Sequence, residues 1–209
     1  PALKSELATG IDIALERYLS AGGVLSASLF HRNVKDLMRT VTTLESPSWS
    51  PGQPRYVARP QNVGDAVTQG IELEAKFRLT ELWADAPPLD LRTNASFYRS
   101  RVKSVPGPDN RLEQQAPATA NLGADYRLRG LPLMIGGNFN WTPGYDTRLS
   151  DTQTATVNHK SVLDAYALWT IQPGVQLRLA ASNAAPHDYL TSGSVILAED
   201  GLPPVRETS

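Results

Sequence analysis

The chain has 209 residues, with 20 Lys and Arg against 21 Asp and Glu, and its formal net charge of −1 argues against a nucleic-acid-binding domain, which is usually strongly basic. Because it contains no cysteine, a disulfide framework, a thiolate metal site and a cysteine nucleophile are all excluded. Hydrophobic residues make up 41% and charged residues 20%, as in a folded chain, yet no apolar run is long enough for a membrane-spanning helix.

Alternation of apolar and polar residues, with a period of two, is the dominant pattern along the chain. The alternating segments, in chain order, are 6–19, 24–38, 71–79, 89–98, 120–128, 133–141, 163–171 and 175–182. The third is the clearest and reads Ile71, Glu72, Leu73, Glu74, Ala75, Lys76, Phe77 and Arg78. A helix would carry these charges around every side, whereas a strand places them all on one face. The sequence therefore predicts eight strands.

The connections between these segments alternate between short and long. Short ones lie near 20–23, 83–88, 129–130 and 172–174, and longer ones near 36–62, 106–110, 142–160 and from 184 onward. Short turns at one end and long loops at the other are typical of an up-and-down transmembrane barrel. The first segment spans 14 residues, enough for a tilted strand to cross a bilayer. We therefore predict an all-β protein, an antiparallel transmembrane β-barrel.

The two faces of such strands should meet different surroundings. In a membrane barrel the apolar face meets lipid and the polar face lines the lumen. We accordingly expect Ile71, Leu73 and Phe77 on the outer surface, and Glu72, Glu74 and Arg78 in the lumen. Four aromatic residues near segment ends fit interfacial girdles, and these are Phe77, Phe97, Trp141 and Trp169. In the alternative, a soluble β-barrel that binds a small apolar ligand, the apolar face would line a closed interior.

Four stretches have the form of barrel strands known from one family. They are Phe-His-Arg-Asn-Val-Lys-Asp-Leu-Met at 30–38, Gln-Asn-Val-Gly-Asp-Ala-Val-Thr-Gln-Gly-Ile-Glu-Leu-Glu at 61–74, Ala-Pro-Ala-Thr-Ala-Asn-Leu-Gly-Ala-Asp-Tyr at 116–126, and 177–189 with Asn183 and Tyr189. Together they resemble the carboxy-terminal part of the barrel of TonB-dependent outer-membrane receptors. The resemblance extends from about residue 6 to 189.

This resemblance implies that residues 1–209 are part of a barrel domain of about 22 strands, with the plug domain and the final strand absent from the chain. We expect the first and eighth strands to pair with strands outside this sequence. The resemblance also implies a location in the bacterial outer membrane and uptake of a scarce nutrient, with a ferric siderophore as the expected ligand. Its partners would be outer-membrane lipid, that ligand, and the inner-membrane TonB complex acting through a plug domain outside this chain. A passive outer-membrane pore is the alternative function.

Motifs for other chemistry are missing from the sequence. His31, His159 and His187 are far apart, and none has a second ligand at i+3 or i+4, so no metal site is predicted. The sequence has no nucleophile elbow, P-loop or dinucleotide-binding fingerprint, so we expect no enzyme, no cofactor and no nucleic-acid partner.

The long connections remain as the predicted recognition surface. The first carries Trp49, Arg55, Tyr56 and Arg59, and the third carries Tyr145 and Arg148. Aromatic and arginine side chains suit an anionic or aromatic ligand such as an iron chelate. In the alternative interpretation each of these residues is simply a solvated loop residue.

Overall fold

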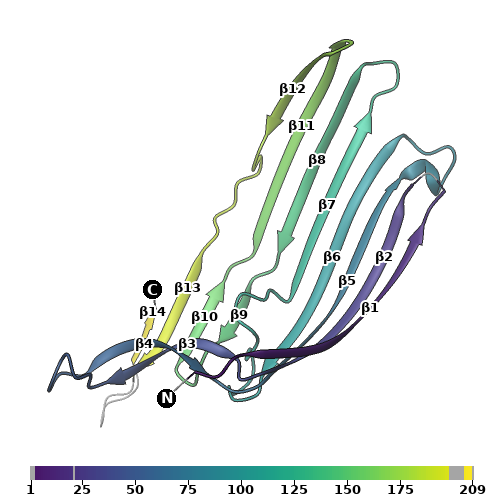
Figure 1. The fold of residues 1–209 in the computed structure, drawn as a ribbon. Coiled ribbons are helices and arrows are strands. Elements are labelled where there is room, and N and C mark those ends of the chain that lie inside the picture. Colours follow the sequence, from purple (N-terminus) through teal and green to yellow (C-terminus); the bar gives the residue numbers. More distant parts are fainter. Residues whose placement is uncertain (1–2, 21, 198–204, 209) are drawn as a thin grey trace.

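A large curved antiparallel sheet forms the body of the molecule (Figure 1). The computed structural model describes residues 3–20, 22–197 and 205–208. Eight strands follow one another in chain order across the sheet: β1 (Leu7–Tyr18), β2 (Val24–Lys35), β5 (Ala66–Arg78), β6 (Leu89–Val102), β7 (Ala118–Arg127), β8 (Leu133–Thr142), β11 (Lys160–Gln172) and β12 (Val175–Ala181). The predicted antiparallel order is confirmed, and each alternating segment of the sequence corresponds to one of these strands.

The pairing register places the alternating apolar residues of neighbouring strands on the same face. Ile71 lies opposite Leu29 on one side and Phe97 on the other, while its sequence neighbour Glu72 lies opposite Ser28 and Ser96 on the other face. The apolar face is exposed, with Leu73 at 44% of its full accessibility. The predicted separation of faces is therefore confirmed. In the soluble-barrel alternative Leu73 would be enclosed, which the structure contradicts.

The short connections gather at one end of the sheet and the long ones at the other (Figure 1). Residues 19–23, 79–88, 128–132 and 173–174 link strands at the short end, and the connection 79–88 includes one 3-10 turn, Leu79–Glu81. Gly130 and Gly174 have φ angles of 77° and 81°, in the left-handed region that a tight turn requires and glycine tolerates. Residues 36–65, 103–117 and 143–159 form the long end.

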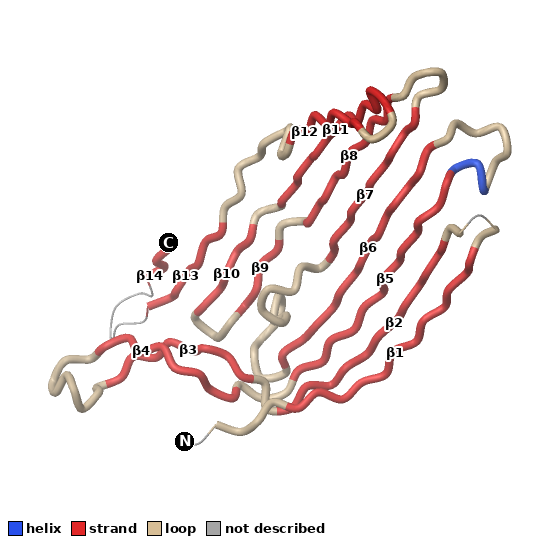
Figure 2. The backbone as a smooth tube through the Cα atoms, turned by 45° about the horizontal axis from the view of Figure 1, so that its top comes forward, coloured by secondary structure: helices blue, strands red, loops and turns tan. Residues whose placement is uncertain are grey.

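The long connections differ from the sequence-based expectation, because they contain strands of their own. Inside 36–62, β3 (Met38–Glu45) pairs with β4 (Arg55–Asn62) in a hairpin. A separate sheet of order β14-β13-β10-β9 joins β9 (Tyr145–Arg148) and β10 (Gln153–Val157) to β13 (Thr191–Leu197) and β14 (Val205–Thr208). The description of these segments as plain loops was wrong. Thr, Val and Tyr are common in them and favour strands, although the segments as a whole are polar and rich in Pro. Figure 2 shows both groups of strands at the same end of the sheet.

Buried apolar packing is confined to this long-connection end. Among the described residues the buried core consists of Val34, Leu37, Ala66, Val102 and Val105. These side chains fix loop 103–117 against the ends of β2, β5 and β6. Elsewhere the sheet has little buried apolar surface of its own.

The two edges of the large sheet are β1 and β12. Within the described ranges, β1 pairs with β2 alone and β12 with β11 alone, and no register joins the two edges. That these edges pair with strands outside this sequence stays a prediction. No helix among the described residues is long and apolar enough to cross a membrane.

Candidate functional site

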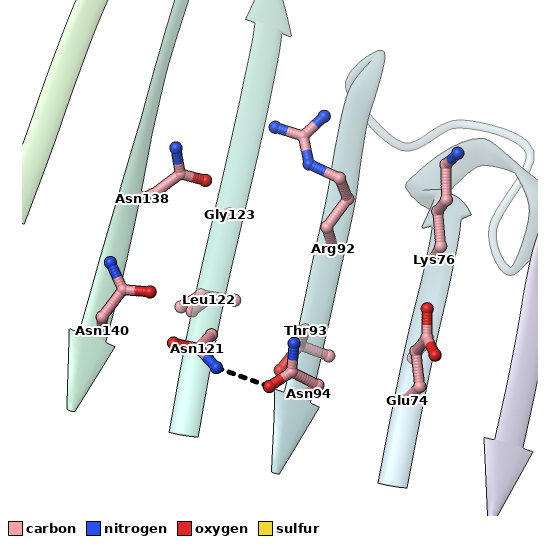
Figure 3. Close-up of a pocket in the computed structure, with 11 residues that line it drawn as sticks. Glu74, Lys76, Arg92, Thr93, Asn94, Asn121, Leu122, Gly123, Asn138 and Asn140 are labelled. Atoms are coloured by element: carbon pink, nitrogen blue, oxygen red, sulfur yellow. Dashed lines mark hydrogen bonds between the residues drawn. The ribbon is translucent and has the colours of Figure 1, made fainter. Parts of the chain in front are cut away.

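The polar face of the sheet carries a hollow of about 280 Å³ (Figure 3). Its polar lining comes from four adjacent strands and consists of Glu74, Lys76, Arg92, Asn94, Asn121, Asn138 and Asn140. The Asn121 amide donates a hydrogen bond of 2.6 Å to the Asn94 carbonyl oxygen across β6 and β7. Carboxylate, cation and amide groups lie side by side in this hollow and can bind water or a polar ligand across β5 to β8.

Gly123 forms the floor between two of these side chains. A Cβ placed there would lie 2.6 Å from Asn138 Oδ1 and 3.3 Å from Arg92 Nε. The missing side chain therefore lets the Asn138 amide and the Arg92 guanidinium lean toward the middle of β7, as Figure 3 shows. The Arg92 guanidinium then reaches Asp125, with Nη1 2.6 Å from the carboxylate.

Two of the predicted lumen charges, Arg78 and Glu72, form side-chain contacts across the strands. Arg78 Nε donates to Asp90 at 2.9 Å on the paired strand, and the Tyr98 hydroxyl donates to Glu72 at 2.8 Å. Asp125 also accepts from the Tyr166 hydroxyl at 2.5 Å, two strands away. These contacts join strands through polar side chains on the face opposite the apolar band.

Arg39, which no sequence pattern marked as a candidate, links β3 to two other segments of the long-connection end, 111–113 and 148–149. Its side chain is only 3% exposed, although it lies on β3 in a long connection. Its guanidinium donates to the carbonyl oxygens of Arg111, Arg148 and Leu149 at 2.5, 3.4 and 3.3 Å, and Nε lies 3.3 Å from Glu113. Burial lowers the pKa of Arg39, and the Glu113 carboxylate opposes that shift. An arginine in a strand has no sequence signature that would have revealed these partners.

The candidates of the first long connection lie on the β3–β4 hairpin, in its turn and along β4. Trp49 and Tyr56 are 68% and 56% exposed. Arg55 donates to Gln53 at 2.8 Å, and Arg59 lies 3.3 Å from Glu45 on the paired strand. The two aromatic side chains are thus free to meet a ligand, whereas the two arginines already have partners within the hairpin.

The candidates of the third long connection lie on β9, beside Arg111. The Arg111 guanidinium stands 5.7 Å from the centre of the Tyr145 ring, and Arg148 donates to the carbonyl oxygens of Ser150 and Asp151, both at 3.2 Å. Burial raises the pKa of Tyr145, as does nearby Tyr189, and Arg111 opposes them. The structure therefore divides the six predicted residues into two groups, and both groups lie at the long-connection end of the sheet.

Two of the three histidines come together in the fold. The rings of His159 and His187 lie 4.2 Å apart, centre to centre, where the segment after β12 passes the start of β11. The sequence distance between them had suggested no such contact. In the described part of the chain, no group of three or more His, Cys, Asp or Glu side chains is arranged to hold a metal ion.

Comparison with known families identifies the architecture. The family described as TonB dependent receptor-like, beta-barrel matches residues 1–184. The chain belongs to this family. Family membership places the chain in the bacterial outer membrane, where the exposed apolar face of a barrel sheet meets lipid. The family consists of transporters rather than enzymes.

A solved structure shares the fold of this receptor barrel. The FrpB iron transporter from Neisseria meningitidis (F3-3 variant) superimposes with a TM-score of 0.57 and 18% sequence identity over 86% of the chain. The chain spans only 26% of the length of FrpB. No curated protein sequence matches the chain.

Proposed function

We propose that the chain forms part of the wall and outer recognition surface of a receptor that imports a scarce nutrient, specifically a ferric siderophore, with energy supplied through the TonB system. This proposal rests on the large sheet, which lies within the region that matches the family. One face of this sheet is apolar and suits lipid, and the other face is polar and leads toward the long connections. The name of FrpB as an iron transporter supports iron as the cargo. In this proposal, contact with TonB is made by a plug domain of the receptor.

The outer hairpin supplies the surface for first contact with the ligand. Trp49 and Tyr56 present exposed aromatic rings, and Arg55 adds a cation beside them. Metal chelates of the siderophore class are frequently aromatic and anionic, and both properties suit stacking and charge-assisted hydrogen bonds. The Tyr145 and Arg148 group provides a second contact region on the same side of the membrane.

Uptake of radioactive iron by cells that carry the full-length receptor tests the transport proposal. We expect iron-starved cells lacking the receptor gene to regain uptake of a catecholate or hydroxamate ferric siderophore when the gene is restored. An uncoupler that collapses the proton gradient should abolish that uptake. Uptake that survives the uncoupler would show a passive pore, and failure with every chelate would show that the nutrient is not a ferric siderophore.

Paired aromatic substitutions test the location of the ligand contact. We expect W49A with Y56A to weaken siderophore binding by about tenfold, because two exposed rings are lost. The matched control is W83A with Y18A, since Trp83 and Tyr18 are 66% and 74% exposed at the opposite end of the sheet. If both double variants bound the siderophore equally well, the hairpin would not be part of the recognition surface, and the transport proposal would be unaffected.

A further inference from the structure

The apolar outer face ends in a polar and basic border toward the long connections. Along three neighbouring strands, the row Leu29, Ile71, Phe97 is followed by the row His31, Gln69, Arg99 and then by Asn33, Val67, Arg101. All nine positions face outward, because they share the parity of the apolar band. The border therefore lies where the outer leaflet of the membrane meets water.

A hollow of about 410 Å³ crosses this border. The outward side chains that line it are Leu29, His31, Gln69, Ile71, Phe97 and Arg99. Its lower part is apolar, with Phe97 and Leu29 exposed at 53% and 51%. Its upper part is polar, and His31 Nδ1 lies 3.3 Å from Gln69 Oε1, which ties the imidazole to the neighbouring strand.

The charge at the upper edge of the hollow is positive, because Arg99 and Arg101 lie there. In the described part of the chain, neither Arg99 nor Arg101 forms an ion pair or a side-chain hydrogen bond, and both are exposed. None of the nine outward positions carries a carboxylate. In the next row toward the long connections, Asp65 lies between Lys35 and Lys103, so two cations accompany the one carboxylate of that row.

We propose that this hollow binds the phosphorylated headgroup of an anionic lipid in the outer leaflet. Arg99 and Arg101 are two residues apart on one strand, about 7 Å, so both guanidinium groups can reach one phosphate group. The acyl chain of the same lipid lies along Leu29, Ile71 and Phe97. A free phosphate ion would leave that apolar part uncovered, and the continuity of the two parts therefore favours a lipid. This site is independent of the nutrient that the receptor imports.

Lipid retention by the full-length receptor tests the proposal. We reconstitute it in nanodiscs of phosphatidylcholine that contain a small fraction of a fluorescent bis-phosphorylated glycolipid, or of its dephosphorylated form. We expect preferential retention of the phosphorylated lipid, and about 30-fold weaker retention in the R99Q and R101Q double variant, since each basic residue near a lipid surface contributes roughly a factor of five. The R99K and R101K variant keeps both charges and should recover most of the retention.

The control variant removes two cations elsewhere on the same protein. Arg17 lies on the same face at the opposite end of β1, and Arg129 lies in the short turn after β7, so R17Q with R129Q should retain the lipid as the wild type does. Folding is checked for every variant by the heat-dependent shift in electrophoretic mobility. Equal retention by R99Q with R101Q and the wild type would overturn the proposal, and so would complete competition by inorganic phosphate, which would indicate a free-anion site.

Discussion

The eight-stranded wall and the outer strands differ in where their side chains lie. In the wall, large apolar residues are exposed, with Ile11 at 69% and Leu15 at 75%. At the outer end, Val102 is fully buried and Arg39 is 5% exposed. The wall is therefore held by its backbone ladder and by the lipid around it, whereas the outer end is held by particular side-chain contacts. A substitution in the wall should therefore act by changing how well the side chain suits lipid or water. A substitution at the outer end should act by removing hydrogen bonds or packing contacts.

The largest effect should come from placing a charge on the lipid face of the wall. We expect Leu73→Arg to lower the free energy of unfolding by roughly 2–4 kcal/mol, because Leu73 lies in the middle of β5 on the apolar face. Ser96→Arg is the matched control, since Ser96 lies opposite Glu72 on the polar face and should tolerate the charge. Urea-dependent folding of the full-length receptor into vesicles measures both. A similar loss from both variants would mean that the two faces do not differ in surroundings.

A second effect should be confined to the outer end. We expect Arg39→Met to destabilise the outer segments locally by about 2–3 kcal/mol, because three carbonyl oxygens and Glu113 lose their charged donor. Hydrogen exchange should rise in 103–117 and 143–152 and stay unchanged in β5 and β6. Faster exchange throughout the wall would show that the two regions are not separate in stability.

A third effect should come from adding a side chain where the polar face of the wall is closely packed. A Cβ at Gly136 would overlap the Asp125 carboxylate and lie 2.7 Å from the Tyr166 ring. We therefore expect Gly136→Val to cost about 1–2 kcal/mol of unfolding free energy. Ala165→Val, which adds apolar volume on the exposed lipid face of β11, should be neutral in the same vesicle-folding measurement. A neutral Gly136→Val would mean that the polar contacts of the wall rearrange freely.

The same contrast explains what could be predicted from the sequence. The wall could be predicted because each of its strands repeats a period of two, and Ile71 to Arg78 shows both faces within one segment. The strands inside the long connections could not, because β3, β4, β9 and β10 have mixed burial rather than alternation.

Contacts between residues that are far apart in the sequence leave no local sequence pattern. Arg39 contacts residues more than 70 positions away, and His159 meets His187 through the path of the segment after β12. The six residues chosen for their chemistry lie in the long connections, at one end of the large sheet, and their part in ligand binding stays a prediction. Their division into two groups depends on the hairpin and on β9, which the composition of the loops did not reveal.

The smallest effect should come from loss of an ion pair on the outer hairpin. Its size shows how much exposed charges contribute to the stability of the outer end. Arg59 lies 3.3 Å from Glu45, but the two side chains are 54% and 32% exposed, so water screens most of the attraction. We expect Arg59→Gln to change the free energy of unfolding by no more than about 0.5 kcal/mol. The same substitution at Arg39, which is buried among its partners, should have a several-fold larger effect on hydrogen exchange of the outer segments. If Arg59→Gln and Arg39→Gln opened these segments equally, burial would not be what distinguishes the two arginines, and the outer end would depend on net charge instead of on particular contacts.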